Sequence, residues 1–172
     1  GTDTDGEPVI DPETGLPIEA QEVAACPITV NFEELKAVNP DIVGWIYIEA
    51  IPNISYPIVQ GTDNEYYLKH TVEKTRNSSA SIFLDYQNSP DFTDANTIIY
   101  GHNMYDGTAF RTLMKYDQKP FFEKHPTFTF STLYEEKEYE IISCFYDRVY
   151  LKTENVFKFY QFIDAEDEED FN

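Results

Sequence analysis

The stretch NTIIYGHNMYDGTAF, residues 96–110, joins a short apolar run to a histidine. Residues 97–100 are β-branched or aromatic, which is typical of a strand, and the run stops at Gly101. Gly101 lets the backbone approach a ligand closely, and the YDG triplet at 105–107 predicts a turn. His102 therefore lies where a strand gives way to a loop, a common place for catalytic groups. From these residues alone a structural, hydrogen-bonded histidine is favoured, and an acid–base group is the alternative.

Further short runs of β-branched and aromatic residues are separated by turn residues on both sides of this stretch. Their spacing predicts a mainly β domain, either a barrel or a sandwich. The predicted strands are Trp45–Ile48, Ile54–Val59, Ser81–Leu84, Thr97–Gly101, Thr127–Ser131 and Glu138–Tyr146.

Short helices are predicted between these strands. Asn31 is a good N-cap for a helix over residues 32–38, and Pro40 ends that helix by disfavouring helical geometry at the residue before it. Thr62 is predicted to begin a helix over TDNEYYLKH, with Glu65 completing a capping box. Thr108 is predicted to cap another, and Pro120 to open a third.

The net charge of −20 is concentrated at the two ends of the 172 residues. Residues 1–30 contain seven acids and no Lys or Arg, which predicts an extended acidic linker before a domain over 31–172. The acidic end DAEDEEDFN reads equally well as the first turn of a helix or as a solvated tail. No basic stripe is present for nucleic acid, which we exclude as a partner. No run of 18 apolar residues is present either.

The residues that could assist His102 are not evident from spacing. Cys144 reads as a small buried residue within a strand and Cys26 as part of the linker, with a disulfide between them as the alternative. His70 and His125 read as residues at helix ends. No zinc-type spacing is present, and DFTDAN at 91–96 is favoured as a solvated loop over a weak Ca²⁺ site. We predict no metal and no cofactor.

Three linked stretches resemble the class B sortases of Gram-positive bacteria. They are GWIYIEAIPNISYPIVQGTDNEYYLKH at 44–70, SASIFLDYQN at 79–88, and NTIIYGHNMYDGTAFRTLMKY at 96–116, and the resemblance runs from about Phe32 to about Tyr146. It implies a sortase-like β-barrel of eight strands with short helices and an N-terminal helix. Because six strands are predicted here, the last two strands are expected to be missing from this sequence.

The resemblance also implies a function and a site. Sortases of this class are cysteine transpeptidases that cleave a C-terminal sorting signal, often of the pattern N-P-x-T-x, through a Cys thioester. An amine of peptidoglycan or of a pilin then resolves the thioester. His102 corresponds to the family's proton-transferring histidine. Asn64 and Leu68 correspond to residues that line the substrate groove, and Tyr100 is either a third lining residue or only a packing residue.

The sequence departs from the family in lacking two motifs. The nucleophile's TLxTC-like motif and the later essential Arg are absent, and Arg76, Arg111 and Arg148 lie too early in the order of strands. We therefore expect this chain alone to be inactive and the parent protein to continue past Asn172. The acidic linker suits a domain held at the extracellular face of the membrane by an N-terminal anchor outside this sequence. The alternative is a non-catalytic, sortase-like surface domain that binds peptides.

Overall fold

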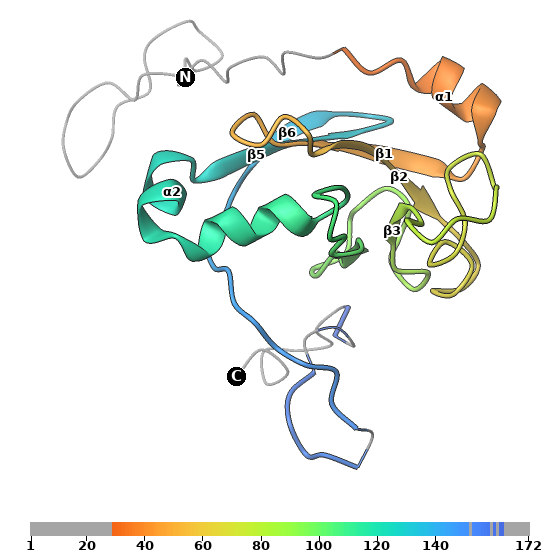
Figure 1. Cartoon of the computed structure of the whole chain (residues 1–172). Coiled ribbons are helices and arrows are strands. Elements are labelled where there is room, and N and C mark those ends of the chain that lie inside the picture. The colour runs from red at the N-terminus through yellow and green to blue at the C-terminus, as the bar shows by residue number, and fades with distance from the viewer. Residues whose placement is uncertain (1–28, 152, 159, 161, 164–172) are drawn as a thin grey trace, which may run out of the picture.

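The computed structural model describes residues 29–151, 153–158, 160 and 162–163 (Figure 1). All but the last two residues of the predicted linker, together with Cys26 and the acidic end at 164–172, lie outside this part. The helical elements are α1 (Phe32–Val38), the 3₁₀ helix η1 (Arg111–Asp117) and α2 (Lys119–Lys124). The strands are β1 (Ile42–Tyr47), β2 (Ser55–Gln60), β3 (Ile82–Leu84), β4 (Ile99–Tyr100), β5 (Thr127–Thr132) and β6 (Glu136–Glu140).

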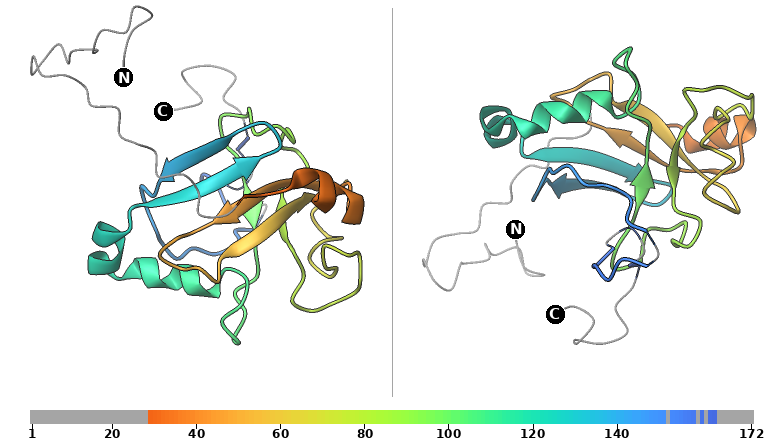
Figure 2. Two further views of the ribbon diagram at one scale, coloured as in Figure 1. Left: turned by 90° about the horizontal axis from the view of Figure 1, so that it is seen from above. Right: turned by 60° about the horizontal axis from the view of Figure 1, so that its bottom comes forward.

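The six strands form one curved sheet in the order β4-β3-β2-β1-β5-β6, and Figure 2 shows its curl from two sides. The β2–β3 pair is parallel and the other neighbours are antiparallel. Strands β4 and β6 are the two edges, so the sheet is a half-barrel rather than a closed one. The predicted mainly β fold with short helices and an N-terminal helix is confirmed.

The core lies between this sheet and the helical segment η1–α2, which runs below the sheet in Figure 1. Ile58, Val59 and Leu84, from β2 and β3, are fully buried. Burial of each such side chain is worth about 1.5–3 kcal/mol relative to an exposed one. The middle of the sheet is therefore the rigid base from which the loops at its ends project.

Gly101, directly after β4, shows why the quoted stretch needs a glycine. A Cβ atom at this position would lie 2.4 Å from Cδ2 of Phe110 and 2.6 Å from Cδ1 of Ile82, closer than real Cβ contacts. The close approach at Gly101 is thus made to the Phe110 and Ile82 side chains and not, as predicted, to a ligand. It brings the end of β4 against the chain that leads into η1.

The α1 prediction is confirmed at both ends. The Asn31 side-chain oxygen accepts a hydrogen bond from the Glu34 amide at 3.2 Å, and Asn39, before Pro40, is extended. Pro120 lies in the first turn of α2, as predicted.

The predicted helix at 62–70 is wrong, and so is the predicted cap of the next helix. Residues 62–70 form turns, because Asp63 Oδ1, rather than Thr62, accepts hydrogen bonds from the Glu65 and Tyr66 amides at 2.8 Å each. The fully buried Tyr67 then binds Asp41 through its hydroxyl. The next helix forms as the 3₁₀ helix η1, but Phe110 occupies its N-cap position without a side-chain capping bond, and the Thr108 hydroxyl donates to Asp106 at 2.6 Å.

The last strand is shorter than predicted and the position of Cys144 is wrong. Strand β5 begins at Thr127, so Glu140 is the last residue of β6 that has a strand partner. The Ile141 amide still donates to the Pro126 carbonyl oxygen at 2.7 Å, and before Pro126 the partner chain belongs to α2. Residues 141–150 therefore leave the sheet, and Cys144 is an exposed free thiol rather than a buried strand residue.

Candidate active site

The loop at 61–69 carries two of the predicted site residues and is held by its neighbours on both sides. Tyr67, fully buried, donates to Asp41 Oδ2 at 2.6 Å and accepts from the Asn39 amide at 2.9 Å. Burial, followed by the Asp41 carboxylate, raises the pKa of Tyr67, so its hydroxyl stays protonated. With Tyr67 anchored inward, Asn64 is partly exposed and Leu68 exposed at the surface of the loop.

Asn64 has a fixed amide orientation. Its Nδ2 donates to Asp85 Oδ2 at 2.8 Å, and its Oδ1 accepts from the Tyr86 amide at 3.0 Å. These two partners distinguish the oxygen from the nitrogen of the side chain. A second hydrogen on Nδ2 is left to donate to another acceptor.

Tyr100 both packs and hydrogen-bonds. Its ring stacks on Phe83 with centroids 5.1 Å apart, and its hydroxyl donates to Asp85 Oδ2 at 2.9 Å. Burial, with the Asp85 carboxylate as the second cause, raises the pKa of Tyr100. The hydroxyl is therefore a neutral hydrogen-bonding group near pH 7 and not a proton donor to a reaction.

His102 lies two residues after Tyr100 and is partly buried. Its backbone carbonyl accepts from the Phe110 amide at 2.9 Å, which fixes the chain at the end of β4. Its ring Nε2 lies 3.2 Å from the Leu68 carbonyl oxygen. A carbonyl can only accept, so this bond requires a proton on Nε2 and leaves Nδ1 as the nitrogen that can take up a proton.

A groove of about 920 Å³ gathers the other three predicted residues. Asn64, Leu68 and Tyr100 all line it, and His102 joins it through the Leu68 carbonyl rather than as a lining residue. On the sheet side the remaining lining residues are Phe83, Ile98, Ile99 and Leu113, and on the other side they are residues 143–145, 147–149 and 160. The arrangement combines apolar walls with an amide donor and an adjacent imidazole, which suits an extended peptide.

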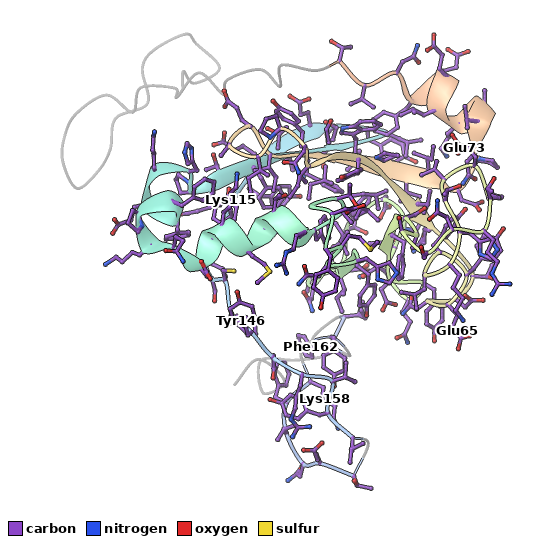
Figure 3. All side chains as sticks on the ribbon, viewed as in Figure 1. Glu65, Glu73, Lys115, Tyr146, Lys158 and Phe162 are labelled. Atoms are coloured by element: carbon purple, nitrogen blue, oxygen red, sulfur yellow. The ribbon has the colours of Figure 1, made fainter. Side chains whose placement is uncertain are left out.

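The segment after β6 forms the far wall of this groove. Figure 3 shows Tyr146 below the helical segment and Lys158 farther below it, and the Tyr146 hydroxyl lies 3.3 Å from Asp117 Oδ2. The segment returns toward β4 at Phe162, whose carbonyl oxygen accepts from Asn96 Nδ2. Cys144 is one of the wall residues. A thiol at this wall was not predicted, since the sequence placed Cys144 in the core.

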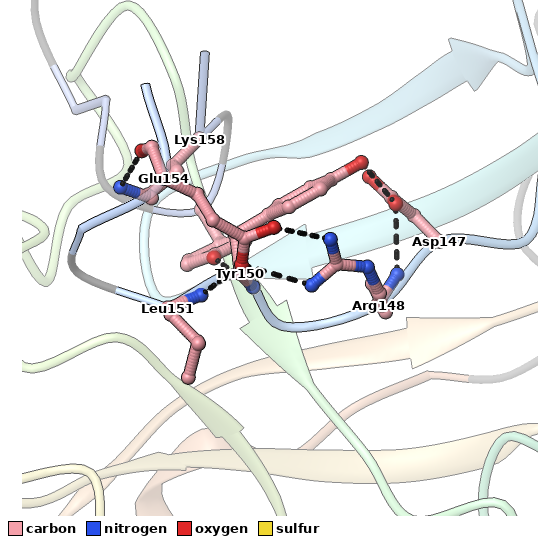
Figure 4. A network of polar contacts seen from close by, with 7 residues as sticks. Asp147, Arg148, Tyr150, Leu151, Glu154 and Lys158 are labelled. Carbon is pink, nitrogen blue, oxygen red and sulfur yellow. Dashed lines mark hydrogen bonds and ion pairs between the residues drawn. The ribbon is translucent and has the colours of Figure 1, made fainter. Parts of the chain in front are cut away.

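Arg148, also in this wall, is already paired. Its guanidinium forms an ion pair with Glu154 and lies 4.4 Å from the centroid of the Tyr150 ring (Figure 4). Glu154 Oε2 also accepts from the Leu151 amide at 2.6 Å. Hydrogen bonding from Arg148, then from Leu151, lowers the pKa of Glu154, which keeps the pair charged.

The described part of the chain contains no group of three or more His, Cys, Asp or Glu side chains placed to hold a metal ion. Within the same residues, no helix has both the length and the apolar character needed to cross a bilayer.

Comparison with known proteins decides the family. Residues 46–167 match the Sortase domain family. The chain belongs to the sortase family. It is 42% identical over 127 residues to Sortase B of Listeria monocytogenes, covering 72% of this chain and 51% of that protein. It is 35% identical over 139 residues to Sortase B of Staphylococcus aureus, covering 78% of this chain and 57% of that protein.

Solved sortase structures have the same fold. A Staphylococcus aureus sortase B–substrate complex matches with a TM-score of 0.71 at 33% identity, covering 81% of this chain and 61% of that one. Sortase B from Bacillus anthracis in complex with AAEK1 matches with a TM-score of 0.71 at 34% identity, covering 81% of this chain and 62% of that one. The resemblance to class B sortases is thus confirmed, and this sortase chain spans about half to three fifths of the length of these relatives.

Sequence reasoning missed Asp85, the residue that both Asn64 and Tyr100 contact. The signal was available, because an aspartate directly after the buried run IFL is unusual for a strand end that faces the core. What no local pattern gave was the pairing of this carboxylate with a residue 21 positions earlier and another 15 positions later.

Proposed function

We propose that this sortase domain belongs to a cysteine transpeptidase that recognises a C-terminal sorting signal of surface proteins. The proposal rests on one observation above all, the convergence of Asn64, Leu68 and Tyr100 on a single groove beside His102. In support, a neighbouring sortase B structure was solved as a substrate complex.

The proposed reaction divides the chemistry between groups. A cysteine thiolate attacks the carbonyl of the scissile peptide bond, the C–N bond breaks, and a thioester forms on the cysteine. The departing amine needs a proton, which we assign to His102. A cell-wall or pilin amine then attacks the thioester, and the sulfur leaves as thiolate.

The nucleophile of this proposal lies outside the 172 residues, since the sequence contains no TLxTC-like motif. Cys144 is not assigned this role, because it lies on the irregular segment after β6. The proposed location is the extracellular face of the membrane, through an N-terminal anchor outside this sequence.

The test uses a longer form of the protein that contains the proposed cysteine and a quenched fluorescent peptide of the pattern Asn-Pro-Ala-Thr-Ala. His102→Ala is expected to lower the cleavage rate by about 10²–10⁴-fold, the usual contribution of an acid–base group. His125→Ala, at the end of α2, is the matched control and should cleave as the parent does. Equal cleavage rates of the His102→Ala variant and the parent would refute the assignment of His102 as the proton donor.

A second candidate function is a non-catalytic peptide-binding domain, favoured by the groove being lined within this chain alone. It predicts binding of the same peptide that thiol alkylation does not weaken, with no cleavage by any longer form. Cleavage that alkylation abolishes would exclude it.

A further inference from the structure

Asp85 is a buried carboxylate that none of the chemistry above uses. It directly follows β3 and is 2% exposed. Its amide donates to the Ile98 carbonyl at 2.9 Å, and its own carbonyl accepts from the Gln60 side chain at 3.0 Å. The backbone at this position is therefore fixed from the β2 side and from the chain that enters β4.

The side chain of Asp85 accepts three hydrogen bonds. Oδ2 accepts from the Tyr100 hydroxyl at 2.9 Å and from Asn64 Nδ2 at 2.8 Å, while Oδ1 accepts from the Gln87 amide at 2.9 Å. All three donors are neutral. A buried carboxylate is costly unless it is hydrogen-bonded, so these donors are held strongly in place.

Two of these donors lie on the two chain segments that build the groove. Asn64 is on the loop at 61–69, which also carries Leu68, and Tyr100 is on β4, two residues before His102. The same oxygen atom of Asp85 thus connects the loop to the strand. The hydrogen bond between the Leu68 carbonyl and the His102 ring is a second connection between this loop and the chain after β4.

We propose that Asp85 is a positioning residue for the peptide groove. It turns the Asn64 amide so that Oδ1 faces the Tyr86 backbone and the free Nδ2 hydrogen can face the peptide, and it fixes the ring of Tyr100 as part of the groove wall. It touches neither peptide nor reacting atoms. The predicted effect of Asp85 on peptide affinity rests on the proposed peptide-binding function. Its predicted effect on the orientation of the Asn64 and Tyr100 side chains does not.

The Glu136–Ser131 pair supplies a control at the other edge of the sheet. Glu136 Oε2 accepts from the Ser131 hydroxyl at 3.2 Å, and neither residue lines the groove. Glu136→Gln therefore changes a hydroxyl-bound carboxylate without touching the loop at 61–69 or Tyr100.

Asp85→Asn keeps the size of the side chain but replaces one carboxylate oxygen with an amide donor. If the new nitrogen takes the Oδ2 position, both the Tyr100 hydroxyl and the Asn64 amide face a donor, and if it takes the Oδ1 position, the Gln87 amide does. We expect fluorescein-labelled Asn-Pro-Ala-Thr-Ala peptide to bind this variant about tenfold more weakly, which corresponds to the loss of one hydrogen bond to a charged group.

Tyr100→Phe should weaken peptide binding less. The loss of affinity in the double variant should be smaller than the product of the two single losses, because both changes act on the same hydrogen bond. Glu136→Gln should bind within about twofold of the parent, because neither Glu136 nor its partner Ser131 lines the groove.

NMR of the Asn64 side-chain amide and the His102 ring gives a second readout that needs no peptide. In Asp85→Asn both sets of signals should shift, and in Glu136→Gln neither should. If the parent does not bind the peptide, the proposed function falls, and these signals alone decide whether Asp85 positions the groove. Unshifted signals in Asp85→Asn overturn the inference, as does parent-like peptide affinity or strict additivity with Tyr100→Phe. If Asp85→Asn does not fold, the Asn64 signals in Tyr100→Phe decide, because this variant removes one bond to the same oxygen.

Discussion

At the scale of single residues, two aspartates each hold a tyrosine hydroxyl by a hydrogen bond. Asp41 and Asp85 each lie at the end of an apolar stretch and each accept a tyrosine hydroxyl, one from Tyr67 and one from Tyr100. The two pairs differ in their surroundings. Asp41 also forms an ion pair with Lys74 at 2.8 Å, whereas the three donors to the Asp85 carboxylate are neutral. The Asp41 carboxylate is partly exposed to solvent, whereas the Asp85 carboxylate is buried.

The Asp41 carboxylate makes stability depend on pH in a definite direction. Burial alone would raise the pKa of Asp41, but hydrogen bonds from Lys74 and Tyr67 and the Lys74 charge outweigh it, so the pKa is lowered. A lowered pKa stabilises the fold above the unfolded value of about 3.9, and this contribution is lost as the pH falls through the folded value.

Asp41→Asn should therefore reduce the free energy of unfolding at pH 7 by about 0.5–1 kcal/mol, the size of a partly exposed ion pair. The difference from the parent should disappear as the pH falls through the lowered pKa of folded Asp41, because the parent carboxylate is then protonated as well. Urea unfolding at a series of pH values measures both. Lys74→Met in the Asp41→Asn background should add little, because the pair is already broken. A difference that persists unchanged in acid would contradict this account.

At the scale of elements, the sequence predicted what local pattern controls. The Asn31 cap, the stop before Pro40 and the six strands follow from residues close in the chain, and the structure confirms them. The errors occur where distant partners decide. The loop at 61–69 is not helical because Tyr67 is buried in the core. Strand β6 ends at Glu140 because its partner strand β5 begins only at Thr127, shortly after α2.

The candidate site divides in the same way. His102 could be singled out from its own neighbours, at the point where a strand meets a loop. Asn64 and Leu68 came only from the family resemblance, since nothing in TDNEYYLKH marks a groove. Asp85 was missed by both approaches, because its importance depends on contacts that only the folded sheet creates.

The junction between β4 and η1 gives a prediction at this scale. Gly101→Ala should lower the free energy of unfolding by about 1–3 kcal/mol, since the added methyl group overlaps Phe110 and Ile82 in a packed core. Chemical denaturation measures the loss. Ile82→Val removes the atom that lies 2.6 Å from the new methyl group, so the double variant should be more stable than the sum of the single losses predicts. Full additivity would show that the clash is relieved elsewhere.

At the scale of the whole molecule, the half-barrel leaves apolar groups uncovered. The segment after β6 exposes many large apolar side chains, of which Ile142 is 90% and Val149 82% exposed. Strands β4 and β6 are also edges of the sheet, with backbone groups free to pair with another chain. Uncovered apolar surface next to an open edge favours association between copies.

We therefore expect this 172-residue chain to self-associate as its concentration rises, and Ile142→Ser together with Val149→Ser to reduce that association. The same change should alter the free energy of unfolding by less than about 0.5 kcal/mol, because both side chains already contact solvent. Sedimentation velocity over a concentration series measures the first effect and urea unfolding the second. Tyr105→Ser is the control, since Tyr105 is 98% exposed but lies on the loop after β4, away from this segment. If this control reduces association as much as the double change does, the surface responsible is not the segment after β6. If the double change instead destabilises the fold, residues 142 and 149 pack in solution against a surface that the half-barrel provides.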